Sequence, residues 1–236
     1  MCGRIIITDT APDLAAMFDV EHEGENLPEP SWNIRPTEQI PIVLESARTD
    51  PAVRRLESAR WSLIPSFATE STSKFPTFNA RAETAAEKPT FKASVRARRA
   101  IVPVTGYFEW HTEGTVKTPY FVHSDDEMPL AFAGLYSWWR NPAAADDDPA
   151  RWLLSATILT QDAQGPLAQI HDRTPVALPE DWWDQWLDPA AEGDQALVDA
   201  AVAASTTVME SLNFYEVGPV KGDGPELIEP LHNVSM

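Results

Sequence analysis

The apolar residues of this chain occur in short runs rich in β-branched and aromatic side chains, separated by polar segments with proline or glycine. Such runs predict roughly eight short strands with a few helices among them. Helices do not alternate regularly with strands, so the pattern is not that of βαβ units. We therefore expect an α+β fold with a mainly antiparallel, barrel-like sheet and peripheral helices. The strand candidates are residues 3–8, 39–44, 53–61, 100–104, 107–110, 120–123, 130–138, 152–160 and 214–217.

Local signals add helices and loops to this outline. Thr10 precedes Ala-Pro-Asp and is expected to cap a short helix. Residues 31–36 have no periodicity and are expected to be irregular, whereas Asn79 is expected to open a helical stretch and is a candidate for its N-cap. Strands 120–123 and 130–138 are expected to pair with each other through a turn. Amphipathic helices are expected after Pro179, with its tryptophans in the core, and over residues 195–204.

The length and composition are those of one globular unit. A chain of 26.2 kDa can bury a sizeable core, so we expect a single domain over residues 2–230 and a tail over 231–236. No apolar run approaches the ~20 residues of a membrane span, and no signal peptide is recognisable, which favours a cytoplasmic protein. A single cysteine excludes intramolecular disulfides and a Cys-rich zinc site. We expect neither a metal nor a cofactor.

The charge is strongly acidic overall but unevenly distributed. The formal net charge of -18 suggests a surface adapted to high salt, and taken alone it argues against nucleic-acid binding. Residues 74–99 reverse the sign, because they hold seven basic and two acidic residues. This basic segment is a candidate phosphate contact, although it could equally be a solvated helix face.

The only cysteine, Cys2, directly follows Met1. Removal of Met1 would give a residue with a free α-amine, of reference pKa ~7.7 to 8.0, beside a thiol of reference pKa ~8.5. Such a 1,2-aminothiol can condense with an aldehyde to an imine, and its thiol can then close a thiazolidine ring. The alternative is that Cys2 is a small apolar residue opening a strand.

Two further residues have chemistry that their surroundings do not explain. Glu109 stands between Phe108 and Trp110 in an apolar strand, where a carboxylate is costly unless it is paired, so it is a candidate acid or base. His171 opens a His-Asp-Arg sequence after an apolar segment. It is a second acid-base candidate, or else part of a hydrogen-bonded structural corner.

Five segments together identify a resemblance. They are Met1-Cys-Gly-Arg4, Trp61-Ser-Leu-Ile-Pro65, Asn79-Ala-Arg-Ala-Glu-Thr84, Gly106-Tyr-Phe-Glu-Trp110 and Ile170-His-Asp-Arg-Thr-Pro-Val176. In this order they resemble the SRAP family of SOS response-associated peptidases, also called abasic-site processing proteins. The similarity extends from residue 2 to about Pro230.

The resemblance implies a function in the response to DNA damage. Family members cap abasic sites in single-stranded DNA by covalent attachment through the N-terminal cysteine, and remove their own initiator methionine. It implies Cys2 as nucleophile, Asn79 beside the abasic sugar, and Glu109 and His171 as acid-base groups. The product would be a thiazolidine crosslink, with lyase activity as a further expectation and a monomer as the expected state.

The resemblance also implies DNA contacts. These are Arg4, Trp32, Pro36, Phe67, Arg81 and Thr160, with the two arginines as phosphate ligands. The chain departs from the family pattern at Ser66-Phe67, where relatives usually have tryptophan, and at Pro219, where relatives tend to have asparagine. Trp61, like Trp32 and Phe67, is a candidate for stacking on a base.

Two other functions compete with crosslinking. Cys2 with His171 and Glu109 could form an N-terminal-nucleophile amidase acting on a small amide or peptide. A non-enzymatic single-stranded DNA binding module, in which Cys2 only packs, is the other. The basic segment 74–99 favours DNA over a small amide.

Overall fold

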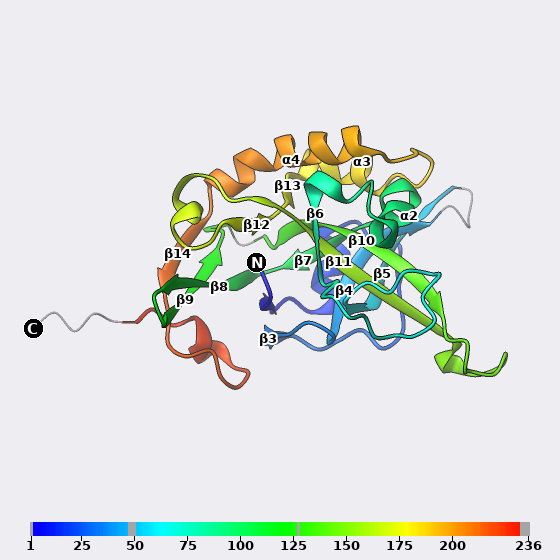
Figure 1. Cartoon of the computed structure of the whole chain (residues 1–236), viewed down its shortest axis with the longest axis horizontal. Coiled ribbons are helices and arrows are strands. Elements are labelled where there is room, and N and C mark those ends of the chain that lie inside the picture. The colour runs from blue at the N-terminus through cyan, green and yellow to red at the C-terminus, as the bar shows by residue number, and fades with distance from the viewer. Residues whose placement is uncertain (1, 47–50, 127, 232–236) are drawn as a thin grey trace, which may run out of the picture.

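Five strands of the computed structural model close into a barrel (Figure 1). The structure describes residues 2–46, 51–126 and 128–231. Around the barrel the neighbours run β5, β4, β7, β10 and β11 in antiparallel pairs, and a parallel pairing of β11 with β5 completes the ring. The strands are β4 (Gln39–Ser46), β5 (Val53–Trp61), β7 (Arg99–Val104), β10 (Leu130–Arg140) and β11 (Trp152–Asp162).

Four short strands extend the barrel at its edges. β6 (Asn79–Arg81) pairs in parallel with β11, and β12 (Arg173–Pro175) pairs antiparallel with the same strand. β13 (Ala177–Leu178) pairs with β10, and β2 (His22–Glu23) pairs in parallel with β5. Because β6 and β12 share β11 as neighbour, they bring the Asn79 and His171 segments to the same strand.

A second sheet, antiparallel throughout, has the order β14-β9-β8-β1-β3. Its strands are β1 (Ile5–Ile7), β3 (Ser31–Ile34), β8 (Gly106–Glu113), β9 (Val116–His123) and β14 (Asn213–Glu216). The three isoleucines of β1 are buried, as expected of a central strand in a two-sided core. The fold is therefore α+β with a mainly antiparallel, barrel-like sheet, as the sequence predicts.

Helices cover the outside of the barrel, and Figure 1 shows α3 and α4 lying together along one side of it. Thr10 caps α1 as predicted, in a reciprocal capping box with Asp13. Within the described residues no helix is long and apolar enough to span a membrane. The helices are α1 (Ala11–Met17), α2 (Pro89–Ala97), α3 (Trp183–Leu187) and α4 (Gln195–Glu210), with 3₁₀ turns η1 (Ala82–Thr84), η2 (Pro149–Arg151), η3 (Gly165–Gln169), η4 (Glu180–Trp182) and η5 (Pro225–Ile228).

The core contains most of the large aromatic residues. Trp183 and Trp186 of α3 are buried, which confirms the prediction that this helix packs through its tryptophans. Trp61 is also fully buried and donates its indole N–H to the carbonyl of Phe78 at 2.9 Å, so its assignment as a base-stacking residue is wrong. A ring held inside the core has no face left for a ligand.

Arg99 is likewise an interior residue rather than a surface cation. Its guanidinium donates to the backbone carbonyls of Trp186 at 2.7 Å, Val95 at 3.0 Å and Ala191 at 3.0 Å. These bonds join the end of α2 to the segment after α3. The basic segment 74–99 therefore offers one cation fewer to a ligand than its sequence suggests.

Three local predictions are wrong. Residues 31–34 form strand β3 rather than an irregular segment, because they pair with β1. Residues 79–81 form strand β6, so Asn79 does not cap a helix. Strands β9 and β10 lie in different sheets and do not pair. The expected tail lies outside the described residues from residue 232 onward.

Candidate active site at Cys2

The pairing of β1 with β8 determines the position of Cys2. Ile5 lies opposite Tyr107, and the N–H of Phe108 donates to the carbonyl of Arg4 at 2.9 Å. Continuing this antiparallel register places Gly3 opposite Glu109. Cys2 is fully buried in the main core cluster, which also contains Tyr107. The start of the chain therefore lies along the strand that carries the Gly-Tyr-Phe-Glu-Trp motif.

Glu109 lies close enough to Cys2 to affect its ionisation. Tyr107 and Glu109 are two positions apart in β8 and therefore point to the same face. Burial, and after it the negative charge of Glu109, raises the pKa of the Cys2 thiol well above its ordinary range. The Glu109 side chain is only 5% exposed, and one of its oxygens accepts from the N–H of Trp110 at 3.3 Å. The thiol is thus held protonated next to a buried carboxyl group.

Asn79 completes the group around Cys2. Its side-chain Nδ2 donates to the backbone carbonyl of Cys2 at 2.6 Å. The parallel pairing of β6 with β11, with Asn79 opposite Ile158, holds the amide there. The Oδ1 atom of Asn79 is buried and has no hydrogen-bond partner among the described residues, so it remains an acceptor for a ligand. The structure thus brings together three of the four predicted catalytic residues: Cys2, Asn79 and Glu109.

Tyr107 belongs to the same group, although sequence reasoning did not select it. Its hydroxyl lies 3.1 Å from Oγ1 of Thr174. Burial raises the pKa of Tyr107 above its ordinary range, the hydrogen bond with Thr174 offsets part of that rise, and the negative charge of Glu109 adds to it. The period-two alternation with Glu109 was the signal in the sequence that could have pointed to it.

His171 lies in the turn between η3 and β12, three residues before Thr174. Its Nδ1 is 2.9 Å from the backbone N–H of Arg173 and 2.6 Å from a carboxylate oxygen of Asp172. The first contact needs the lone pair of Nδ1 and the second needs a proton on it, so the two contacts belong to different protonation states. Through Thr174 this turn is connected to Tyr107, which adjoins Cys2.

Arg173, the neighbour of His171, joins three elements near the site. Its guanidinium binds both carboxylate oxygens of Glu83 at 2.6 and 3.0 Å, Asp162 at 2.5 Å and the carbonyl of Thr160 at 2.6 Å. Partial burial alone would raise the pKa of Glu83, but the hydrogen bonds and charge of Arg173 hold it below its usual range. This buried arginine fixes η1, which directly follows β6, against β11 and the His171 turn.

Arg4 is held on the face of β8 opposite to that of Tyr107 and Glu109. Its Nη1 donates to Oδ1 of Asn33 at 2.6 Å, and Asn33 in turn donates to the carbonyl of Gly222 at 2.5 Å. The guanidinium lies over the ring of Trp110, 5.8 Å from its centroid. Burial, and after it the nearby charge of Arg35, lowers the pKa of Arg4 from its ordinary value. The guanidinium is therefore oriented within the structure rather than extended into solvent.

The predicted DNA contacts lie in three regions. Pro36 and Phe67 line one cleft of about 760 Å³. Arg81 is exposed at the end of β6, opposite the buried Thr160 in the pairing with β11. Trp32 is half-buried near Arg4, and its backbone N–H donates to Oδ1 of Asp223 at 2.6 Å. No cluster of metal-binding side chains occurs in the part of the chain that the structure describes.

Comparisons with known proteins show which family the chain matches. The model of the SOS response associated peptidase (SRAP) family matches residues 1–220. A Bacillus subtilis protein named abasic site processing protein YoqW is 31% identical, with 97% of this chain and 99% of that protein covered. An Escherichia coli protein named abasic site processing protein YedK is 32% identical, with 98% and 100% covered.

Solved structures give the same fold. A crystal structure of a Bacteroides thetaiotaomicron protein superposes with a TM-score of 0.76 at 23% identity, covering 97% of this chain and 99% of the other. The family match extends over nearly the whole chain and includes all five segments that carry the resemblance. This chain belongs to the SOS response associated peptidase (SRAP) family.

Proposed function

We propose that this protein processes abasic sites in DNA by forming a covalent crosslink through Cys2. The observation that carries the proposal is the group formed by Cys2, Asn79 and Glu109. The Asn79 amide binds the carbonyl of Cys2, the residue that would bear the 1,2-aminothiol, and the buried Glu109 carboxyl group lies beside the Cys2 thiol. Relatives similar over nearly their whole length are named abasic site processing proteins. A ring-opened abasic deoxyribose presents an aldehyde, the electrophile that suits this nucleophile.

The reaction begins at nitrogen, because the buried thiol is held protonated. The α-amine of Cys2 attacks C1′ of the aldehyde, and loss of one water gives an imine. The Cys2 sulfur then adds to C1′ while the thiol proton passes to nitrogen, which closes the thiazolidine ring. Glu109, beside the thiol, accepts and returns the proton of the attacking amine. No oxidant or reductant is needed.

The remaining residues bind the strand and open the sugar. His171 exchanges a proton with the sugar hemiacetal as the ring opens, and Asn79 presents its buried Oδ1 to the abasic nucleotide. Arg4 and Arg81 bind phosphates, while Trp32, Pro36 and Phe67 contact the single strand. Thr160 is buried and acts indirectly, by pairing with Arg81 between β11 and β6. With a formal net charge of -18, long-range attraction to DNA is weak, so close contacts and the covalent bond must retain the strand.

Removal of Met1 is a necessary part of this proposal, since it liberates the α-amine. We propose that the protein hydrolyses the Met1–Cys2 bond itself, and that it acts as a cytoplasmic monomer. A lyase step would follow if the imine forms but the ring does not close.

The experiment is intact-mass analysis after incubation with a single-stranded oligonucleotide that contains one abasic site. We expect a denaturation-resistant adduct with the wild-type protein and none with Cys2→Ala. A matched oligonucleotide with a tetrahydrofuran in place of the abasic sugar has no aldehyde and should give no adduct. A wild-type protein that binds abasic DNA without an adduct would instead indicate a binding module.

A further inference from the structure

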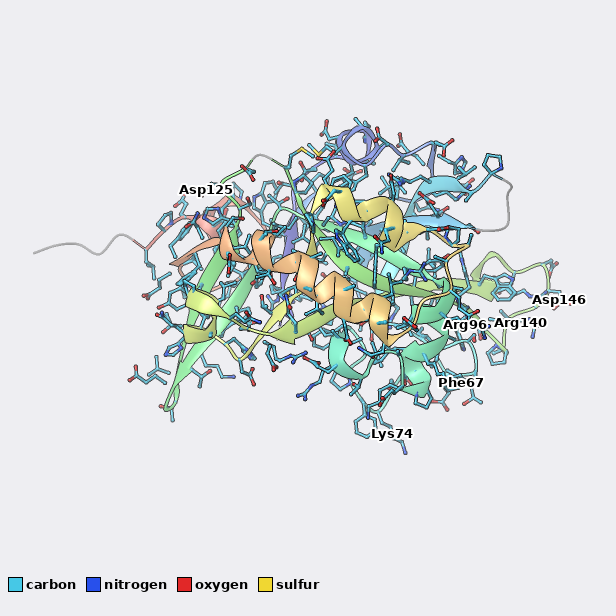
Figure 2. All side chains as sticks on the ribbon, turned by 90° about the horizontal axis from the view of Figure 1, so that it is seen from above. Phe67, Lys74, Arg96, Asp125, Arg140 and Asp146 are labelled. Carbon is cyan, nitrogen blue, oxygen red and sulfur yellow. The ribbon has the colours of Figure 1, made fainter. Side chains whose placement is uncertain are left out.

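The hydroxyl groups of Tyr107 and Thr174 join two parts of the candidate site that belong to different sheets. Tyr107 lies on β8, the strand of Glu109 in the five-stranded sheet, whereas Thr174 is the central residue of β12 in the barrel sheet. The two hydroxyl oxygens are 3.1 Å apart. Figure 1 and Figure 2 both show the segment of η3 and β12 beside the hairpin of β8 and β9. The pair therefore links β12, and the turn before it, to β8.

Both side chains are enclosed by the core. Tyr107 is 2% exposed and Thr174 is 3% exposed, and the ring of Phe132 packs edge-on against that of Tyr107, with the ring centroids 5.8 Å apart. A phenylalanine and a valine would fill the same volume. Replacing both partners of a buried hydrogen bond by apolar groups of the same shape is nearly neutral for stability. Packing alone thus gives no reason for two hydroxyl groups here, whereas a directional contact between β8 and β12 does.

A short chain of contacts leads from Thr174 to the imidazole of His171. The residue before Thr174 is Arg173, and its backbone N–H donates to Nδ1 of His171 at 2.9 Å. The turn is also held from the barrel side, because Ala163 N–H donates to the carbonyl of Asp172 at 2.9 Å. A shift of Thr174 away from β8 would move the Arg173 N–H, and with it the His171 ring.

This contact determines which nitrogen of the imidazole is available for proton transfer. When Nδ1 accepts from the Arg173 N–H, the proton of the neutral ring is on Nε2. In the proposed reaction His171 exchanges a proton with the sugar hemiacetal, and this requires Nε2 to lie within hydrogen-bond reach of the sugar oxygen. An imidazole held in one orientation therefore acts faster than one that rotates.

We propose that Tyr107 is a positioning residue for His171, which it orients through Thr174 and the backbone N–H of Arg173. The inference rests on the proposed function and adds to it the contact that keeps β8 and the His171 turn in one geometry. Tyr107 takes no part in bond making, and its hydroxyl keeps its proton throughout. Loss of this hydroxyl should slow opening of the sugar ring without weakening DNA binding or the reaction of Cys2 with an open-chain aldehyde.

Single-turnover adduct formation with abasic single-stranded DNA measures the effect. Tyr107→Phe and Thr174→Val each remove one hydroxyl group with little change of shape, and each should lower the maximal rate about fivefold or more at an unchanged half-saturating DNA concentration. Thr174→Ser retains the hydroxyl group and should restore the rate to within about twofold. The double variant should be no slower than the slower single variant, because both lose the same contact. Tyr215→Phe is the control, since its hydroxyl donates to the carbonyl of Ile228 at 2.7 Å.

Propanal separates sugar opening from the chemistry of Cys2, because it has no ring to open. Its adduct at Cys2, followed by intact mass, should form at the wild-type rate in Tyr107→Phe. Equal slowing with propanal and with abasic DNA would overturn the proposal, since the hydroxyl would then act on Cys2 itself. Wild-type rates with abasic DNA in both single variants would overturn it too. Tyr107→Phe and Thr174→Val remove the contact from opposite ends, so if one does not fold in a thermal melt, the other decides.

The orientation of His171 is also visible without any crosslinking. In protein that contains isotopically labelled histidine, the imidazole resonances of His171 are assigned by their absence in His171→Gln. They should move in Tyr107→Phe and Thr174→Val, and stay in place in Thr174→Ser and Tyr215→Phe. If wild-type protein forms no adduct with abasic DNA while these shifts occur, the crosslinking function is refuted and the positioning role stands. Unmoved His171 resonances in Tyr107→Phe would refute the positioning role whatever the rates.

Discussion

The side-chain amide of Asn79 donates a 2.6 Å hydrogen bond to the backbone carbonyl of Cys2, across 77 residues of sequence. This bond fixes the start of the chain, which would otherwise be free to fray. It also leaves the second polar atom of Asn79 available to a ligand. Asn79 is therefore in a position both to orient the nucleophile and to bind what it attacks.

Replacing Asn79 tests the importance of this orientation. Asn79→Asp is nearly isosteric but exchanges the donor for a carboxylate that repels the Cys2 carbonyl, so crosslinking should slow by about tenfold or more. Single-turnover adduct formation on abasic DNA measures the rate. Asn141→Asp is the control, because the Asn141 oxygen only accepts from Ala143 N–H and an aspartate can do the same. Equal rates for Asn79→Asp and wild-type protein would show that the bond has no part in the reaction.

Glu109 is expected to transfer protons during adduct formation. Glu109→Gln keeps the shape of the side chain but removes its basicity, so the single-turnover rate should fall by roughly 10² to 10⁴. Glu113→Gln is a matched control, because Glu113 lies on the same strand β8 and is exposed. If Glu109→Gln crosslinks as fast as Glu113→Gln, the carboxyl group is not the proton carrier.

The buried thiol also predicts how stability depends on pH. Burial raises the pKa of the Cys2 thiol above its ordinary value of ~8.5. The stability that the protonated thiol contributes is therefore complete below that pH and is lost as pH rises further, because the unfolded thiol ionises first. Above pH 9 this loss should amount to about 1.4 kcal/mol per pH unit. Cys2→Ser should lack it. Urea unfolding of both proteins at pH 8 and at pH 10 provides the comparison, and identical alkaline losses would mean that the thiol is not buried.

The ion pair of Arg173 with Glu83 should contribute to stability. Arg173 is buried, so Glu83→Gln removes a partner from an interior charge and should cost more than a surface pair, about 1 to 3 kcal/mol. The control Glu192→Gln breaks the exposed pair with Arg96 and should cost less than ~1 kcal/mol. Because Arg173 lowers the pKa of Glu83, the wild-type advantage over Glu83→Gln should be lost as the pH falls below about 4.5. Equal urea midpoints for the two variants at neutral pH would contradict this.

The sequence predicted the strands well where the signal was local. The buried run of β1 and the strands of the barrel coincide with runs of β-branched and aromatic residues. Strands β3 and β6 were missed because each forms only by pairing with a distant strand, and neither has an alternating pattern of its own. The Asn-Ala-Arg sequence of β6 has no apolar run to mark it as a strand.

In the candidate site, too, some residues could be recognised from the sequence and others only from long-range contacts in the fold. Cys2 and Glu109 were recognisable because a lone N-terminal thiol and a carboxyl group in an apolar strand are chemically unusual. Alternation with Glu109 could have placed Tyr107 on the same face of its strand, but the contact of Tyr107 with Thr174, 67 residues away, has no sequence signal. The role of Arg173 could not be read from the sequence either, since it depends on Glu83, 90 residues away. Trp61 shows the opposite error, because this large aromatic residue near a motif belongs to the core.

The most direct measurement is the mass of the N-terminal peptide after the crosslinked complex has been digested with a protease and a nuclease. We expect a peptide that begins at Cys2, lacks Met1 and carries the deoxyribose remnant less one water, stable without chemical reduction. A remnant attached to a lysine, or a peptide that retains Met1 and is unmodified, would rule out a thiazolidine crosslink at Cys2.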